Sequence, residues 1–182
     1  WKAGISLPFG KAQYVQAGIA QHSTNLISIN KNQIISSKHL PEYVDLRIKS
    51  LTMGLKRNRL DFDLNPRKGY SVSLNISISQ KHVVPNSLIE DLTKFDPGFN
   101  YSTLYDSLRE NSLRASIEGF VQYFIPWGSR STILIAADAG VLKSGNKLFS
   151  NEFFRLGGYA RLRGFDEESI LAQYFTIFTA EY

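Results

Sequence analysis

The chain has 182 residues, of which 43% are hydrophobic and 20% are charged, and its formal net charge is +5. This composition argues against a disordered chain, and the length allows one domain with a hydrophobic core. The absence of cysteine excludes disulfides, thiolate metal sites and a cysteine nucleophile. The histidines (His22, His39 and His82) lack metal-ligand spacing, so we expect neither a metal nor a cofactor. No apolar run approaches the ~18 residues of a membrane helix, but strands that cross a membrane remain possible.

Hydrophobic residues recur with a period of two along most of the chain, which predicts β-strands. In residues 69–79 one face carries large apolar side chains and the other carries small polar ones. Residues 115–125 and 131–141 alternate in the same way. In residues 43–62 the alternation changes phase near Ser50. A β-bulge, or an exit of the strand from a buried zone, would each explain this change.

The connections between these runs alternate in length. Short turns with Pro and Gly lie at 8–10, 66–69 and 126–128, and long polar loops lie at about 29–42, 84–112 and 142–172. Because antiparallel neighbours reverse direction, all short turns lie at one end of the sheet. Short turns at one end, long loops at the other and strands of ~9–11 residues or more are typical of outer-membrane barrels. Aromatic residues near the short turns suit a membrane interface; they are Phe9, Tyr70, Tyr123, Phe124 and Trp127. A soluble sandwich or lipocalin-like barrel is the alternative.

The segment 153–165 contains the pair Gly157-Gly158, followed by Leu162-Arg163-Gly164-Phe165. It resembles the signature of the Omp85 superfamily, which includes the outer-membrane assembly factors BamA and TamA and the two-partner secretion transporters. The family more often has Val at the position of Leu162. The turn from Pro66 to Gly69 is similar to the periplasmic turn of the family, and the resemblance covers roughly residues 43–182.

This resemblance implies an all-β fold, namely part of an antiparallel transmembrane β-barrel of about sixteen strands. Residues 1–182 would belong to this single barrel domain. Loop 142–172 would be the sixth external loop, folded into the lumen. The remaining strands and the periplasmic POTRA domains would lie outside the chain. The expected sixth to twelfth strands are 1–8, 12–28, 43–62, 69–83, 113–125, 131–141 and 173–182.

The resemblance also assigns roles to a few residues. In the family the motif Arg pairs with an acidic residue on the inner wall, which implies a pair between Arg163 and Glu181. A guanidinium suits such a pair because its rigid fork matches a carboxylate. Gly164 would allow a tight turn, and Phe165 would pack against the wall. The side chains expected to face lipid are Tyr70, Val72, Leu74, Ile76, Ile78, Ile133 and Ile135.

We therefore expect a non-enzymatic factor of a Gram-negative outer membrane that inserts or translocates proteins; an organellar membrane is less favoured. Its partners would be the lipid bilayer, unfolded outer-membrane or secreted clients and accessory assembly subunits. Two alternatives are a dedicated two-partner-type secretion pore and the barrel of a patatin-like lipase fusion, although this chain has no Gly-x-Ser-x-Gly motif. A passive porin is a further alternative. Nucleic-acid binding is disfavoured, because the basic residues are not interleaved with exposed aromatics.

Overall fold

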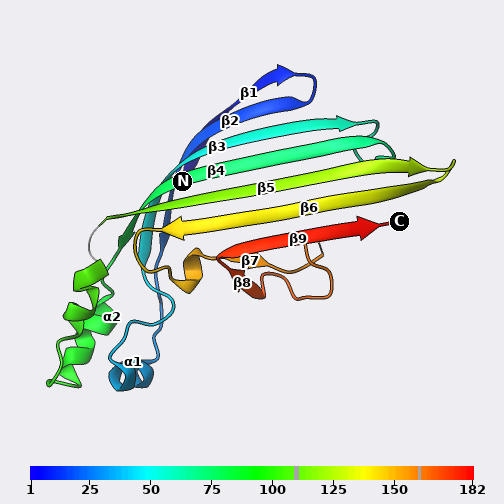
Figure 1. Ribbon diagram of the computed structural model, residues 1–182. Coiled ribbons are helices and arrows are strands. Elements are labelled where there is room, and N and C mark those ends of the chain that lie inside the picture. The colour runs from blue at the N-terminus through cyan, green and yellow to red at the C-terminus, as the bar shows by residue number, and fades with distance from the viewer. Residues whose placement is uncertain (109–110, 160) are drawn as a thin grey trace.

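A computed structural model describes residues 1–108, 111–159 and 161–182 of the chain, without the side chain of Ser107. The main sheet is seven-stranded, antiparallel and open, with the order β1-β2-β3-β4-β5-β6-β9 (Figure 1). Its strands are β1 (Lys2–Gly10), β2 (Gln13–Thr24), β3 (Leu46–Leu60), β4 (Gly69–Val83), β5 (Ser112–Trp127), β6 (Ser131–Ser144) and β9 (Tyr174–Glu181). A small second sheet pairs β7 (Phe154–Leu156) with β8 (Ile170–Ala172). The predicted antiparallel β-fold is thus confirmed, and β4 has the bounds that the resemblance implied for this strand, 69–83.

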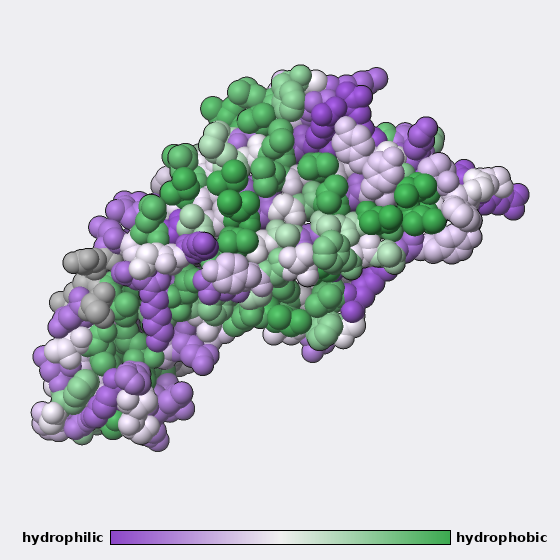
Figure 2. Space-filling model, in the orientation of Figure 1, coloured by the Kyte–Doolittle hydropathy of each residue, from purple (hydrophilic) through white to green (hydrophobic). Residues whose placement is uncertain are grey.

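The two faces of the main sheet differ in chemistry. We call the face on which residues 145–159 and 161–173 lie the inner face and the opposite one the outer face. The pairs Val72–Val121 and Ile76–Ile117 belong to the outer face. Its apolar side chains are largely exposed: Met53 is 58% exposed and Ile135 is 51% exposed. Hydrophobic side chains cover the middle of the strands in Figure 2. A continuous exposed apolar surface of this kind marks contact with lipid or another protein.

The aromatic residues near the short turns divide between the faces. Tyr70 and Tyr123 are cross-strand partners on the outer face. Trp127 has the same parity as Tyr123 along β5 and also belongs to the outer face. Phe124 pairs with Leu134 and belongs to the inner face. The expectation that Phe124 joins an outer aromatic belt is wrong, because successive residues of a strand point to opposite faces.

Among the described residues, all the helical segments lie in the long connections, at one end of the sheet (Figure 1). These segments are α1 (Lys31–Ser37), α2 (Ser87–Glu90), η1 (Asp91–Lys94), η2 (Tyr101–Leu108) and η3 (Ser150–Glu152). The loop expected at 84–112 thus contains α2–η1 and η2, although residues 109–110 lie outside the described part. The sequence did not predict α1, which begins after Asn30, whose side chain accepts a hydrogen bond from the Gln33 N–H (3.3 Å). None of the described helices is long and apolar enough to cross a membrane.

We call residues 25–45, 84–108 and 145–152 together the cap. The cap covers the inner face where the strands meet the long loops, and the main hydrophobic core lies between the cap and the ends of β3 and β4. Hydrogen bonds join its loops, from Asn86 Nδ2 to Asp45 (2.9 Å) and from Asn151 Nδ2 to the Val44 carbonyl (2.9 Å). The buried core consists of Ile34, Val44, Leu46, Ile48, Val83, Ile89, Leu92, Tyr101, Tyr105 and Phe149.

This core explains the change of phase in β3. Leu46 and Ile48 point inward into the cap core, where they are 1% and 9% exposed. Beyond Ser50 the inner face is no longer covered by the cap, and Leu51 is 53% exposed on the outer face. The register between β3 and β4 runs without interruption from Leu46–Val83 to Leu60–Gly69. Of the two explanations, the exit from a buried zone is therefore correct, and there is no bulge in this strand pair.

Candidate functional site

Three carboxylates lie on the inner face of neighbouring strands. Glu118 of β5 pairs with Gly140, Asp138 of β6 pairs with Phe120, and Glu181 of β9 pairs with Leu134. The period of two places each of them on the same side as Ser73, Ser77 and the other small polar residues of β4. Asp138 is only 8% exposed. A buried carboxylate needs a cation or hydrogen-bond donors, so this wall requires a partner from another segment.

The partner segment is the loop around β7 and β8, and its glycine pair sets its shape. Gly157 and Gly158 have φ values of 117° and 88°, a region that favours glycine. A Cβ atom on Gly157 would lie 2.2 Å from the Asp166 carbonyl oxygen. A Cβ atom on Gly158 would lie 2.1 Å from the Glu167 carboxylate. At Gly157 the backbone of Asp166 thus approaches more closely than any side chain would permit, whereas Glu167 could move away from a side chain at position 158, where the positive φ favours glycine.

The structure brings Arg163 and Glu181 together. Arg163 Nη1 lies 3.1 Å from Glu181 Oε1, and the guanidinium lies 5.1 Å from the ring centre of Tyr159. Their side chains are 60% and 37% exposed, so this pair is open to water in the chain. Gly164 has a φ of 90° with open space around it, so its conformation and not its size requires glycine. Phe165 is 54% exposed and is not packed in the manner expected of it. Of the motif segment, Ala160 lies outside the described residues.

A second loop arginine, which the sequence analysis did not single out, makes more contacts with the wall. Arg161 Nη2 lies 3.1 Å from Glu118 Oε2, and Arg161 Nε lies 3.2 Å from Asp138 Oδ2. The same guanidinium lies 5.6 Å from the ring centre of Phe175, which in turn packs edge-on against Phe154. Arg161 therefore links two neighbouring strands. Glu118 and Asp138 are charged residues on a face that otherwise carries small polar side chains. In the sequence, this exception to the pattern could have indicated that a cation contacts them.

The beginning of the same loop is fixed by a buried ion pair. Glu152 Oε1 lies 2.8 Å from Lys81 Nζ and accepts a hydrogen bond from the Phe149 N–H at 3.0 Å. Lys81 Nζ also donates to the Lys147 carbonyl oxygen (2.7 Å), and Arg114 Nη2 donates to the Glu152 carbonyl oxygen (3.1 Å). The side chains of Lys81 and Glu152 are 2% and 0% exposed. Sequence reasoning missed this pair because its partners are far apart in the chain.

Comparison with known families agrees with this architecture. The model of the Omp85 superfamily domain matches residues 1–177, nearly the whole chain. The chain belongs to the Omp85 superfamily. Searches of curated proteins and of solved structures gave no match.

Membership of the Omp85 superfamily accounts for the main features of the structure. It associates the chain with an outer membrane, and with the insertion or translocation of proteins. The open antiparallel sheet is consistent with part of an Omp85-type barrel. Among the described residues, no group of His, Asp or Glu is arranged to hold a metal ion.

Proposed function

We propose that this chain belongs to a barrel that inserts client proteins into an outer membrane or moves them across it, without any covalent chemistry. The observation that carries the proposal is the attachment of the motif loop to the inner wall through Arg161 and Arg163. A loop inside a barrel loses conformational entropy when it is ordered, and charge-assisted hydrogen bonds offset that loss. The loop would thereby brace the wall while clients are handled.

The arrangement within the whole protein is part of the same proposal. The seven strands of the main sheet would be the sixth to twelfth of about sixteen, with residues 142–172 as the sixth external loop. The outer row of β4, which consists of Tyr70, Val72, Leu74, Ile76 and Ile78, would face lipid. Ile133 and Ile135 of β6 would also face lipid. POTRA domains upstream would receive unfolded clients, and accessory subunits would assist. The membrane would be the outer membrane of a Gram-negative bacterium.

Charge reversal in the full-length protein tests the role of the loop. Arg163→Glu places two carboxylates together and should release this end of the loop, with a loss of function. Adding Glu181→Arg restores opposite charges and should recover part of the function. Arg155→Glu is the matched control, because Arg155 pairs with Glu168 inside the loop (3.3 Å) and not with the wall. If Arg163→Glu and Arg155→Glu reduce function equally, the wall contact has no special role.

The readout is the outer-membrane proteome of cells depleted of the native protein and supplied with each variant. A joint fall of many unrelated barrels would identify a general assembly factor. Failure of one secreted or surface protein alone would identify a dedicated transporter. If depletion changes no envelope protein, the proposed insertion or translocation role is wrong.

A further inference from the structure

The short-turn end of the sheet carries cations that have no carboxylate partner. Among the described residues, none of them takes part in an ion pair, whereas the cap, the inner wall and the loop around β7 and β8 contain all the pairs found. The Nε atoms of Arg57 and Arg67 are also buried without a hydrogen-bond partner. The cations at this end, apart from the inward-facing Lys56, are Lys11, Arg57, Arg59, Arg67, Lys68 and Arg130.

Two of these cations lie on the outer face, between the apolar surface and the short turns. Arg57 pairs with Val72 and Arg59 with Tyr70, and both partners belong to the outer row of β4. Along β3 the outer row therefore passes from Leu51, Met53 and Leu55 to two arginines. The guanidinium of Arg57 lies 5.7 Å from the ring centre of Tyr70. An apolar surface that ends in arginine and tyrosine matches the boundary between lipid tails and headgroups.

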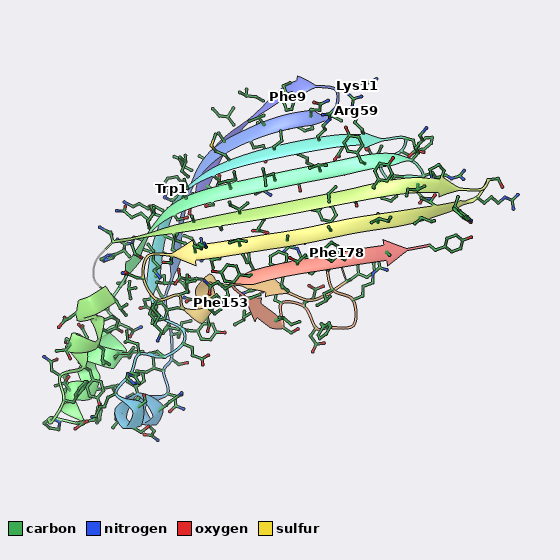
Figure 3. All side chains as sticks on the ribbon, viewed as in Figure 1. Trp1, Phe9, Lys11, Arg59, Phe153 and Phe178 are labelled. Atoms are coloured by element: carbon green, nitrogen blue, oxygen red, sulfur yellow. The ribbon has the colours of Figure 1, made fainter. Side chains whose placement is uncertain are left out.

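A hollow of about 870 Å³ opens between the first two short turns at this end. Lys11, Arg59 and Lys68 line it, and Lys11 and Arg59 lie close together in Figure 3. Asp61 also lines the hollow, but its Oδ1 accepts hydrogen bonds from the backbone N–H groups of Phe62, Arg67 and Lys68. These hydrogen bonds lower the pKa of Asp61. The carboxylate is thus already used within its turn, and Asp63 is the other acidic residue of the hollow.

We infer that this end of the outer face binds the phosphate groups of anionic phospholipids in the leaflet on the short-turn side. Arginine presents paired N–H donors that suit a phosphate, and the excess of cations favours a lipid with net negative charge over a zwitterionic one. The inference rests on the outer face lying against lipid and does not depend on the insertion role. A free phosphate ion offers the same oxygens but lacks the acyl chains that would pack on Leu55 and its neighbours.

The test compares full-length protein in nanodiscs of phosphatidylcholine alone and of phosphatidylcholine with added phosphatidylglycerol. Retained phosphatidylglycerol is counted by native mass spectrometry, and the melting temperature is measured in both lipids. Arg57→Gln with Arg59→Gln should reduce phosphatidylglycerol affinity by on the order of tenfold and remove its stabilising effect. Arg57→Lys with Arg59→Lys keeps the charge and should retain part of the binding.

Lys56→Gln is the matched control, because it removes the neighbouring positive charge from the inner face of the same strand. It should leave phosphatidylglycerol binding unchanged. Inorganic phosphate added to phosphatidylcholine nanodiscs should not reproduce the stabilisation. Equal losses for Lys56→Gln and the double arginine variant, or equal stability in both lipids for the unaltered protein, would overturn the inference. If phosphatidylglycerol binding survives the double variant while association with another protein is lost, the cations serve a protein partner and the inference is also wrong.

Discussion

At the long-loop end the strands enter a cap with a buried core and paired charges. At the short-turn end the same strands stop in short turns whose cations have no acidic partner within the part of the chain that the structure describes. β3 shows the difference within one strand. Its apolar residues point inward beneath the cap, at Leu46 and Ile48, and outward beyond it, at Leu51 and Met53. Apolar side chains thus follow whichever face is shielded from water: protein shields the inner face at one end, and a bilayer would shield the outer face along the rest.

The largest effect should come from breaking the buried charge pair of the long-loop end. Glu152→Ala leaves the Lys81 ammonium buried without its carboxylate, and should lower the free energy of unfolding by about 3–5 kcal/mol. Replacing both residues, by Lys81→Met and Glu152→Leu, removes both charges and should recover most of that loss. Urea unfolding of the full-length protein in vesicles measures each variant.

The control for this pair is Arg155→Gln, which breaks the exposed pair between Arg155 and Glu168. Exposed pairs contribute ~0–1 kcal/mol, so this variant should unfold almost as the unaltered protein does. An effect of Glu152→Ala no larger than that of Arg155→Gln would show that the cap does not depend on the buried pair.

The next effect sharpens the contrast between the two faces. Val72→Lys or Ile76→Lys on the outer face of β4 should lower stability in vesicles by about 2–4 kcal/mol, because a charge would enter lipid. Ser73→Lys or Ser77→Lys introduces the same charge on the inner face of the same strand and should be tolerated better. Equal destabilisation on both faces, measured by the same unfolding assay, would contradict the lipid-facing orientation.

The smallest effect concerns a partly exposed contact within the cap. Lys38 pairs with Asp96, and Tyr101 Oη lies 3.0 Å from the same carboxylate. The hydrogen bond from Lys38, then that from Tyr101, lowers the pKa of Asp96 below its ordinary value of 3.8. This contribution to stability is therefore present above pH ~4 and is lost as the pH falls through the lowered pKa.

Asp96→Asn should reduce the loss of stability at low pH. Near-ultraviolet circular dichroism of the cap tyrosines during an acid titration measures this loss. The substitution should not change how stability depends on alkaline pH. That dependence comes from other groups, among them Tyr105, whose pKa is raised by burial to about 12. An acid transition of the same size in Asp96→Asn and in the unaltered protein would show that this carboxylate does not contribute.

Much of the architecture could be predicted because it depends on local pattern. The period of two predicted the strands and their two faces, and Pro with Gly predicted a short turn after each of three strands. The exact turn positions were less accurate: the segment predicted as a turn at 8–10 belongs to β1, and the turn itself is at Lys11–Ala12. The motif Gly157-Gly158 with Arg163-Gly164-Phe165 indicated the family and the pair that the structure places in contact, Arg163 and Glu181. The function of these residues stays a prediction until the charge reversal is made.

Other parts could not be predicted, because they depend on residues far apart in the chain. The contacts of Arg161 with Glu118 and Asp138, and of Lys81 with Glu152, join segments separated by at least 23 residues. The cap core combines apolar residues from loops that read as polar and irregular, and α1 is too short to leave a periodic pattern.

The sequence by itself determined that this protein forms antiparallel strands with one apolar and one small polar face, because alternation is a local property of the extended backbone. Only the tertiary structure decided where each face is covered. Burial depends on which distant loops fold over a strand, and the pairing of a charge depends on what those loops bring near it. For that reason Leu46 and Leu51 of one strand lie on opposite faces, and Arg161 as well as Arg163 contacts the wall.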